Sequence, residues 1–214
     1  MKLIASLILA ASLAWPQVAA DANKGYKTKE GRDSVAKTLD NPNRDKTQKP
    51  EEIITLMEVK PGMAVADIGT GTGYMLPFLS RAVGPTGKVI GEDIQSDFLD
   101  RARSKVSADK LANVTLNLGT ETDPKLPADS VDIAMALDVY HHFDYPDKML
   151  ANIAHGLKAH GRFVVVDFYK KDRPDHIRLE RDDVRHEIES NGFKFVSMTE
   201  RTGNNQYMLI FEKQ

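Results

Sequence analysis

Val65-Ala-Asp-Ile-Gly-Thr-Gly-Thr-Gly-Tyr74 is the most informative segment of this chain. An apolar run from Met63 to Asp67 predicts a short buried strand. Three glycines follow within five residues, and they allow a tight turn in which a ligand approaches the backbone without meeting a Cβ atom. Apolar side chains at helical spacing come next, so the turn leads to a helix N-terminus with free amides. The segment therefore predicts a strand, a tight turn and a helix.

The spacing of these glycines differs from that of dinucleotide-binding domains, whose fingerprint is Gly-x-Gly-x-x-Gly. Counted from Gly69, the third glycine of that fingerprint would fall on Tyr74, and counted from Gly71 it would fall on Leu76. Neither register fits. A nicotinamide-dependent oxidoreductase is therefore kept as a third functional hypothesis, behind the two given below.

Strands and helices continue to alternate after this unit. Further strands are predicted at 88–93, 114–118, 131–137 and 162–167. Ser96 is expected to cap one intervening helix, and Pro146 to open another. A last helix over 180–190 precedes a hairpin of 193–201 and 207–212. Because the strands are almost continuously apolar, the pattern predicts a doubly wound α/β domain whose parallel sheet is covered on both faces.

In such a sheet, ligands bind beyond the carboxyl ends of the strands. Asp93 ends the second strand, 26 residues after Asp67. A carboxylate at this point accepts hydrogen bonds from both hydroxyls of a ribose, which suits an adenosine-type ligand. Its neighbour Glu92 is expected to point to the opposite face of the sheet, because side chains alternate along a strand, so Asp93 is preferred and Glu92 is kept as the alternative.

Several segments together carry a resemblance to a known family. They are the glycine-rich segment above, Gly91-Glu-Asp-Ile94, Leu126-Pro-Ala-Asp-Ser-Val-Asp132 and Gly156-Leu-Lys-Ala-His-Gly-Arg-Phe-Val-Val-Val166. In combination and order they resemble the class I S-adenosylmethionine-dependent methyltransferases, over about residues 48–214. The segment Arg44–Pro50 also resembles one in a bacterial subgroup, although Thr47 replaces its usual Trp. The resemblance implies a seven-stranded, mostly parallel sheet with a C-terminal antiparallel hairpin.

The resemblance also implies a set of residues that bind S-adenosylmethionine. Asp67, Gly69 and Gly71 would hold its methionine part, and Asp93 its ribose. The expected set further includes Thr70, Gly73, Tyr74, Ile94 and Asp138.

The contact to adenine departs from the pattern of the family. Many relatives have Gly-Asp after the third strand, whereas Gly119 is here followed by Thr120-Glu-Thr-Asp123. Thr120 occupies the aligned position, and Asp123 could reach in from the loop or form only a turn before Pro124. Both are kept as candidates.

The candidate catalytic residues follow the fourth strand, in Asp138-Val-Tyr-His-His-Phe143. Methyl transfer is an in-line displacement in which the protein aligns the acceptor and, for an OH or NH group, removes its proton. Either His141 or His142 is the candidate base, since adjacent residues point in different directions and a histidine titrates near neutrality. The other would stabilise the loop. Asp138 would bind the ammonium of the cofactor or orient a histidine.

We expect no metal site. The chain has six histidines, but none of them forms the local H-x-H or H-x-x-x-H pairs that are typical of metal ligands. Cysteine is absent, which excludes disulfides, thiolate metal sites, iron–sulfur clusters and cysteine nucleophiles. With 29 basic and 31 acidic residues, the net charge of -2 gives no electrostatic reason to expect a nucleic-acid partner.

The N-terminal part of the chain has two expected segments. Residues 1–20 read as a signal peptide, with Lys2, an apolar run and small residues before a cleavage site after Ala20. The apolar run is too short to span a bilayer, so we expect a periplasmic or secreted protein with no stable membrane insertion after cleavage. Residues 21–49 are polar and form either a solvated arm or a cap, and residues 50–214 form the cofactor-binding domain.

The leading hypothesis is an exported methyltransferase that acts on a small-molecule O, N or C acceptor. The alternative is a non-catalytic protein of the same fold that binds S-adenosylmethionine or S-adenosylhomocysteine. Export favours the alternative, because the cofactor is made in the cytoplasm. Neither the acceptor nor the oligomeric state follows from the sequence.

Overall fold

The computed structural model describes residues 17–201, 203 and 205–214. One seven-stranded sheet runs through the molecule in the order β3-β2-β1-β4-β5-β7-β6. Its strands are β1 Ala64–Ile68, β2 Lys88–Asp93, β3 Val114–Leu118, β4 Val131–Leu137, β5 Leu157–Phe168, β6 Phe193–Arg201 and β7 Gln206–Lys213. Strands β1 to β5 are parallel, and β7 pairs antiparallel with both β5 and β6. This confirms the predicted doubly wound sheet with a C-terminal hairpin.

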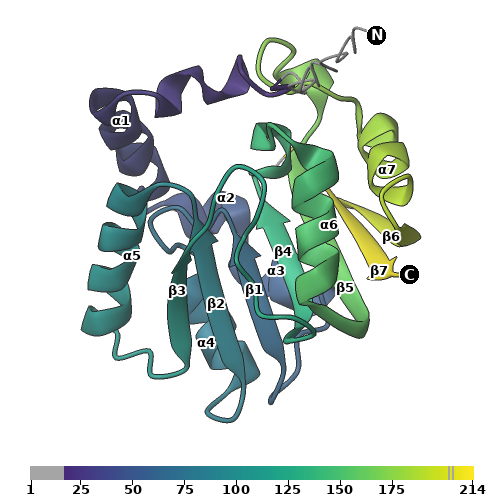
Figure 1. The fold of residues 1–214 in the computed structure, drawn as a ribbon. Helices are drawn as coiled ribbons and strands as arrows, with labels where there is room; N and C mark the ends of the chain where they lie inside the picture. Colours follow the sequence, from purple (N-terminus) through teal and green to yellow (C-terminus); the bar gives the residue numbers. More distant parts are fainter. Residues whose placement is uncertain (1–16, 202, 204) are drawn as a thin grey trace, which may run out of the picture.

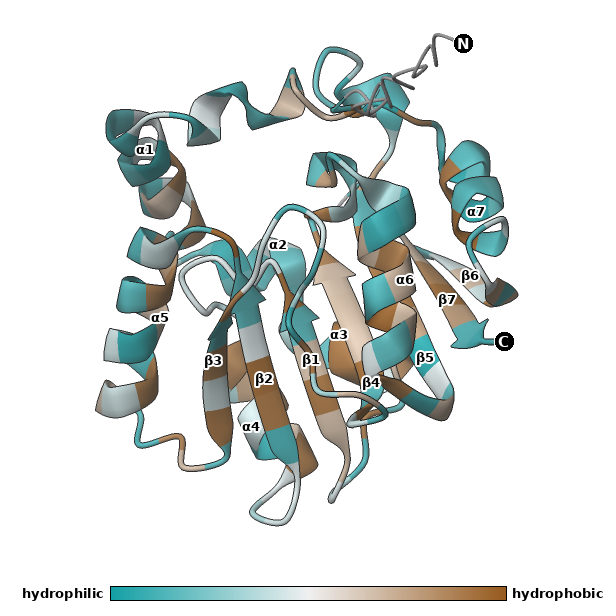
Figure 2. Cartoon of the chain, in the orientation of Figure 1, coloured by the Kyte–Doolittle hydropathy of each residue, from teal (hydrophilic) through white to brown (hydrophobic). Residues whose placement is uncertain are grey.

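Helices cover both faces of the sheet (Figure 1). One core cluster joins the sheet to the buried side chains of α6 and α7, and the other joins it to those of α3, α4 and α5. The bounds of these helices are α3 Pro50–Leu56, α4 Leu76–Val83, α5 Ser96–Ala108, α6 Pro146–Gly156 and α7 Arg181–Glu189. Apolar residues run along most of the strands, while the outer helix faces are polar (Figure 2). Burial on two faces explains the nearly continuous apolar strands.

Two local predictions need correction. Ser96 is the first helical residue of α5 and no side-chain cap is formed, because Gln95 holds the N-cap position. The backbone amide of Gln95 instead donates to Asp93 Oδ1 at 2.8 Å. The strand predicted at 162–167 is longer than expected, since β5 begins at Leu157.

The segment 21–49 folds over the carboxyl ends of the parallel strands (Figure 1). It contains the 3-10 helix η1 Ala22–Tyr26, α1 Lys29–Leu39 and α2 Arg44–Gln48. Arg32 of α1 donates to Asp97 of α5 at 2.7 Å, which fastens this cover to the domain. Residues of this segment, among them Tyr26, Lys27 and Arg44, line the pocket described below.

Two further short helices, η2 Tyr140–His142 and η3 Lys170–Asp172, follow β4 and β5. Within the described ranges, no helix is both long and apolar enough to cross a membrane. Residues 1–16 of the expected signal peptide lie outside the described residues.

Candidate active site

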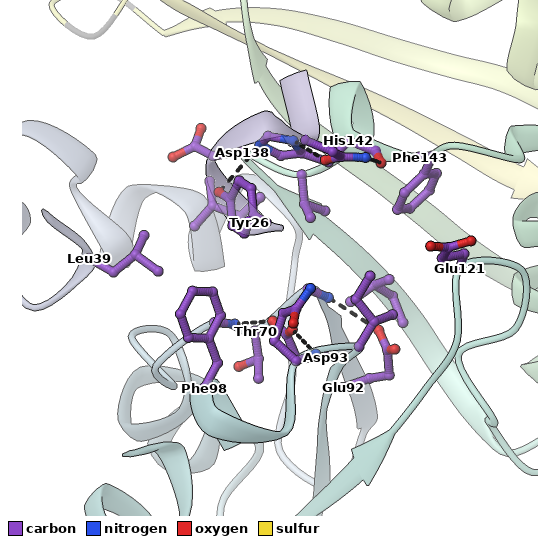
Figure 3. A pocket seen from close by; sticks show the side chains of 18 of the residues that line it. Tyr26, Leu39, Thr70, Glu92, Asp93, Phe98, Glu121, Asp138, His142 and Phe143 are labelled. Carbon is purple, nitrogen blue, oxygen red and sulfur yellow. Dashed lines mark hydrogen bonds between the residues drawn. The ribbon is translucent and has the colours of Figure 1, made fainter. Parts of the chain in front are cut away.

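A pocket of about 370 Å³ lies at the carboxyl ends of β1, β2 and β4, beneath the covering segment. Figure 3 shows its two opposing walls. One wall carries side chains from the glycine-rich turn, the end of β2 and α5, namely Thr70, Glu92, Asp93 and Phe98. The other carries side chains from the covering segment and from the loop after β4, namely Tyr26, Asp138, His142 and Phe143.

The glycine-rich turn forms the floor of this pocket. Gly69 and Gly71 both line it and have φ angles of 67° and 58°, in the left-handed region that favours glycine. A Cβ atom on Gly69 would lie 2.3 Å from Val139 Cγ2, so no larger residue fits there. Gly73 also has a positive φ, but it lies outside the lining and packs against Leu76 and Ala102. Gly73 therefore permits close packing of α4 and α5 and does not face a ligand.

Asp67 and Asp93 line the pocket on either side of this turn. Asp67 Oδ2 accepts a hydrogen bond from Thr70 Oγ1 at 2.7 Å, and Asp93 Oδ2 accepts one from the Gly71 amide at 2.8 Å. Burial raises the pKa of Asp67 to about 7 and that of Asp93 to about 6. Each carboxylate retains free lone pairs for a ligand.

Glu92 also lines the pocket, in contrast to its expected position on the far side of the sheet. Side chains do alternate between the two faces along β2. The strand ends at Asp93, however, and the pocket extends around this end, so that it also includes Glu92. The Gly69 amide donates to Glu92 Oε2 at 3.3 Å, while Oε1 is buried and has no hydrogen-bond partner among the described residues. Burial, followed by the charge of Asp93, raises the pKa of Glu92 to about 8.

Asp138 and Arg44 form a charged pair in the lining, with 3.7 Å between Arg44 Nη2 and Asp138 Oδ2. Asp138 has a φ of 57° and also accepts a hydrogen bond from Gln206 of β7. Burial, then the charge of Asp167, raises the pKa of Asp138 to about 6. Arg44 also stacks on Tyr74, with its guanidinium carbon 4.1 Å from the ring centre.

Of the residues predicted near the adenosine part of the cofactor, some line the pocket and others do not. Ile94 is 42% exposed and lines the pocket, as does Phe98. Thr120 and Asp123 are not part of the lining, because their backbones pair across a small turn and Asp123 binds Lys125. From this loop, Glu121 lines the pocket instead.

The two candidate histidines point in different directions. His142 lines the pocket, whereas His141 is 4% exposed and lies behind the lining. His141 Nδ1 lies 2.7 Å from Oδ1 and 2.9 Å from Oδ2 of Asp167. Asp167, and not Asp138, is therefore the carboxylate that orients a histidine. This geometry leaves His142 as the candidate that can reach a bound acceptor.

Comparisons with known proteins assign the chain to a family. The model of a methyltransferase domain matches residues 59–214. The chain belongs to this methyltransferase family. A solved S-adenosylmethionine-dependent methyltransferase from Aquifex aeolicus has a TM-score of 0.80 and 29% identity, over 85% of this chain and 98% of that one. The recognition of a class I methyltransferase from the sequence is thereby confirmed.

Curated methyltransferases of known reaction match over shorter lengths. Nocamycin O-methyltransferase of Saccharothrix syringae is 32% identical over 39% of this chain. A ubiquinone/menaquinone biosynthesis C-methyltransferase of Pseudomonas aeruginosa is 34% identical over 55% of it. The chain covers less than half of either relative, 30% and 46% of their lengths.

The residues of this methyltransferase domain fit S-adenosylmethionine, which carries a sulfonium and an ammonium group. Four of the carboxylates that line the pocket have pKa values raised by burial, those of Asp67, Glu92, Asp93 and Asp138. Their raised pKa values show that the protein itself supplies too little positive charge to stabilise all four as anions. A cationic ligand supplies that missing charge.

Sequence reasoning missed several residues of the site. Tyr26 and Arg44 lie in the polar covering segment, where no apolar pattern marks them. The segment beginning at Arg44 did carry a resemblance to a bacterial subgroup, and Arg44 lines the pocket. Asp167 could have been recognised as a buried acid at the end of an apolar strand.

Proposed function

We propose that this protein transfers a methyl group from S-adenosylmethionine to an oxygen, nitrogen or carbon atom of a small molecule. The observation that supports this most strongly is the division of the pocket into an acidic wall and a facing wall that holds His142. The first suits a cationic donor, and the second provides a base on the opposite side. Bound S-adenosylmethionine supplies an electrophilic methyl group.

Residues from both walls would divide the cofactor between them. Asp93 would accept hydrogen bonds from the ribose hydroxyls, with Ile94 and Phe98 against the adenosine. Asp67 and Asp138 would hold the ammonium group, and Arg44 would pair with the carboxylate of the methionine part.

The hydrogen bonds around His142 fix the tautomer needed for a base. The amide nitrogen of Asn23 donates to the backbone oxygen of His142 and to Asp144 Oδ2, both at 3.0 Å. This orients Asn23 Oδ1 toward His142 Nδ1, at 2.8 Å, so Nδ1 carries the proton. The lone pair then lies on Nε2, 3.4 Å from the hydroxyl of Tyr26.

The charge state of His142 also suits a base. Burial, together with the neighbouring His141 and His176, lowers its pKa well below the usual value for histidine. It is therefore neutral at neutral pH and able to accept a proton from an acceptor OH or NH group. It would need no prior deprotonation.

A small-molecule acceptor agrees with the covered pocket and with the names of the relatives. The segment 21–49 lies over the pocket mouth, which favours a compact acceptor. The two curated relatives are named as an O-methyltransferase and a C-methyltransferase, and these names support an oxygen or carbon acceptor without choosing between them.

Calorimetry followed by a labelling assay tests this function. S-adenosylhomocysteine is expected to bind with one site per chain. Methyl-labelled S-adenosylmethionine, incubated with the protein and a small-molecule extract of the source cells, is expected to yield a labelled product. Binding without label transfer, in extracts from several growth conditions, would favour the non-catalytic alternative, and saturable binding of NAD in its place would favour the oxidoreductase.

The affinity for S-adenosylhomocysteine is expected to rise with pH. The ligand carries an ammonium group and favours ionised carboxylates, whereas the pKa values of the four acids lie between about 6 and about 8. Protonation therefore competes with binding at low pH, and one pKa unit corresponds to about a tenfold change in affinity. Calorimetry is expected to show an increase of about tenfold or more from about pH 5.5 to about pH 8.5. A flat profile would contradict the role of the acids.

We also propose that the protein is exported, with Asp21 as its first mature residue. The positive start, the short apolar run and the small residues before Asp21 support this. Cleavage would remove two contacts to Asp144, from the amides of Val18 and Ala19. It would keep Asn23 and Tyr26, which contact His142. N-terminal sequencing of the protein from a periplasmic fraction is expected to begin at Asp21, and an intact Met1 would contradict the proposal.

A further inference from the structure

Three histidines gather beside the pocket. His141 and His142 come from η2, and His176 comes from the loop after η3. One ring nitrogen from each lies within 4.8 Å of the others, and the two Nε2 atoms of His141 and His176 are 3.2 Å apart. Within the part of the chain that the structure describes, this is the one such group of potential metal ligands. The spacing of histidines along the sequence did not predict this group, because His176 is distant in sequence and the fold places it beside the other two.

Two of the three rings have the hydrogen-bond partners that metal-binding histidines usually have. Histidines that bind a metal usually donate their other ring N–H group to a carboxylate or a carbonyl, which fixes the ring and its tautomer. His141 Nδ1 does this with Asp167, at 2.7 Å, and His142 Nδ1 with the side-chain oxygen of Asn23, at 2.8 Å. Asp167 is buried and 1% exposed. Its partner His141 is thus held with Nε2 toward His176.

We propose that His141, His142 and His176 bind one divalent transition-metal ion of the Zn²⁺ type. Imidazole nitrogens suit Zn²⁺, Cu²⁺, Fe²⁺ and Ni²⁺, with bonds of about 2.0–2.1 Å to zinc. Two nitrogens on one tetrahedral zinc stand roughly 3.3 Å apart at that bond length, close to the separation of the two Nε2 atoms. The three ligand nitrogens lie within 4.8 Å of one another, so metal binding would draw them closer together. Three protein ligands leave a fourth position for water or a ligand.

An ion can reach this position from the surface. His176 lines a second hollow, between the beginning of the described chain and the segment that follows η3. His142 lines the main pocket. The three rings therefore lie between two openings, one of which avoids the methyltransferase pocket.

A hydrogen-bonded chain from Asp167 through His141 to His176 would give the same short distance without a metal. The two arrangements differ in whether the protein retains an ion. This difference is measured without cofactor or acceptor. A metal ion on His142 would occupy the Nε2 lone pair that the proposed function assigns to the base, so one molecule cannot serve both roles at once, and the two are tested separately.

Metal titration of the full-length protein tests the site. After removal of metals with a chelator, Zn²⁺ and Co²⁺ are expected to bind with one ion per chain, measured by calorimetry and, for Co²⁺, by its absorption spectrum. His176→Gln removes one ligand and is expected to weaken binding at least tenfold. Asp167→Asn disturbs the orientation of His141 and is expected to weaken it by about 10- to 100-fold.

The matched control is His155→Gln, which changes an exposed histidine of α6 that lies outside the cluster. It is expected to bind metal as the unchanged protein does. His176 is not part of the main pocket lining, so His176→Gln is expected to bind S-adenosylhomocysteine normally, which shows that it is folded. The proposal would be overturned if the unchanged protein bound no metal ion. It would also be overturned if His176→Gln and His155→Gln bound the metal with equal affinity.

Discussion

Replacing Asp93 by alanine is expected to weaken the binding of S-adenosylhomocysteine by about 100- to 10,000-fold, since each hydrogen bond to a charged group contributes about 1.5–3 kcal/mol and two are lost. The loss has a second cause within the protein. Asp93 accepts hydrogen bonds from the amides of Gly71 and Gln95, both at 2.8 Å, and so holds the glycine-rich turn against the start of α5. Calorimetry at a pH above the raised pKa of Asp93 measures the effect.

Asp93→Asn is the matched control. It keeps the size of the side chain and one accepting oxygen, but it turns an NH₂ group toward one of the two amides and has no charge. Its affinity is expected to lie between those of the unchanged protein and Asp93→Ala. Thermal unfolding of both variants without ligand separates a loss of binding from a loss of folding. An affinity of Asp93→Ala within a few fold of the unchanged protein would refute the assignment of Asp93 to the ribose.

The sheet could be predicted because its causes are local. Each parallel strand is buried on both faces, so the sequence of Phe163 to Val166 must be apolar throughout. The turn at Gly69 and Gly71 requires positive φ angles, and glycine adopts these most readily. Strands and turns can be predicted from patterns that span only a few residues. The order of the motifs along the chain indicated the family.

The covering segment could not be predicted in the same way, because it is held by polar contacts between residues distant in sequence. Among the apolar side chains of α1, Ala36 is buried, while Arg32 reaches Asp97 of α5. Arg44 is fixed by stacking on Tyr74. Such pairs leave no periodic pattern, so a polar sequence is equally typical of a solvated arm.

The candidate site shows the same limit at single residues. Alternation along β2 placed Glu92 away from Asp93, but the pocket extends around the end of the strand and includes both. His141 and His142 are adjacent in sequence, and the choice between them depends on Asp167 and Asn23, which the fold brings from distant segments. The sequence indicated the loop after β4 as a candidate, and tertiary contacts distinguish its residues.

His142→Gln is expected to lower the turnover of methyl transfer to an OH or NH acceptor by about 100- to 10,000-fold, the usual contribution of a general base. Glutamine keeps a polar side chain of similar length but cannot accept a proton near neutral pH. The affinity for S-adenosylhomocysteine is expected to stay nearly unchanged, because the proposed cofactor contacts are made by other side chains, with Glu92 and Asp93 on the opposite wall. Turnover at saturating cofactor and calorimetry measure the two effects separately.

His141→Gln is the matched comparison, since His141 lies behind the lining and does not face the acceptor. Its effect on turnover is expected to be much smaller than that of His142→Gln. The pH profile adds a second measurement. A base must be neutral, and the pKa of His142 is lowered well below 6.5, so turnover at saturating cofactor is expected to persist below that pH. Equal losses in the two variants, or full turnover in His142→Gln, would exclude His142 as the base.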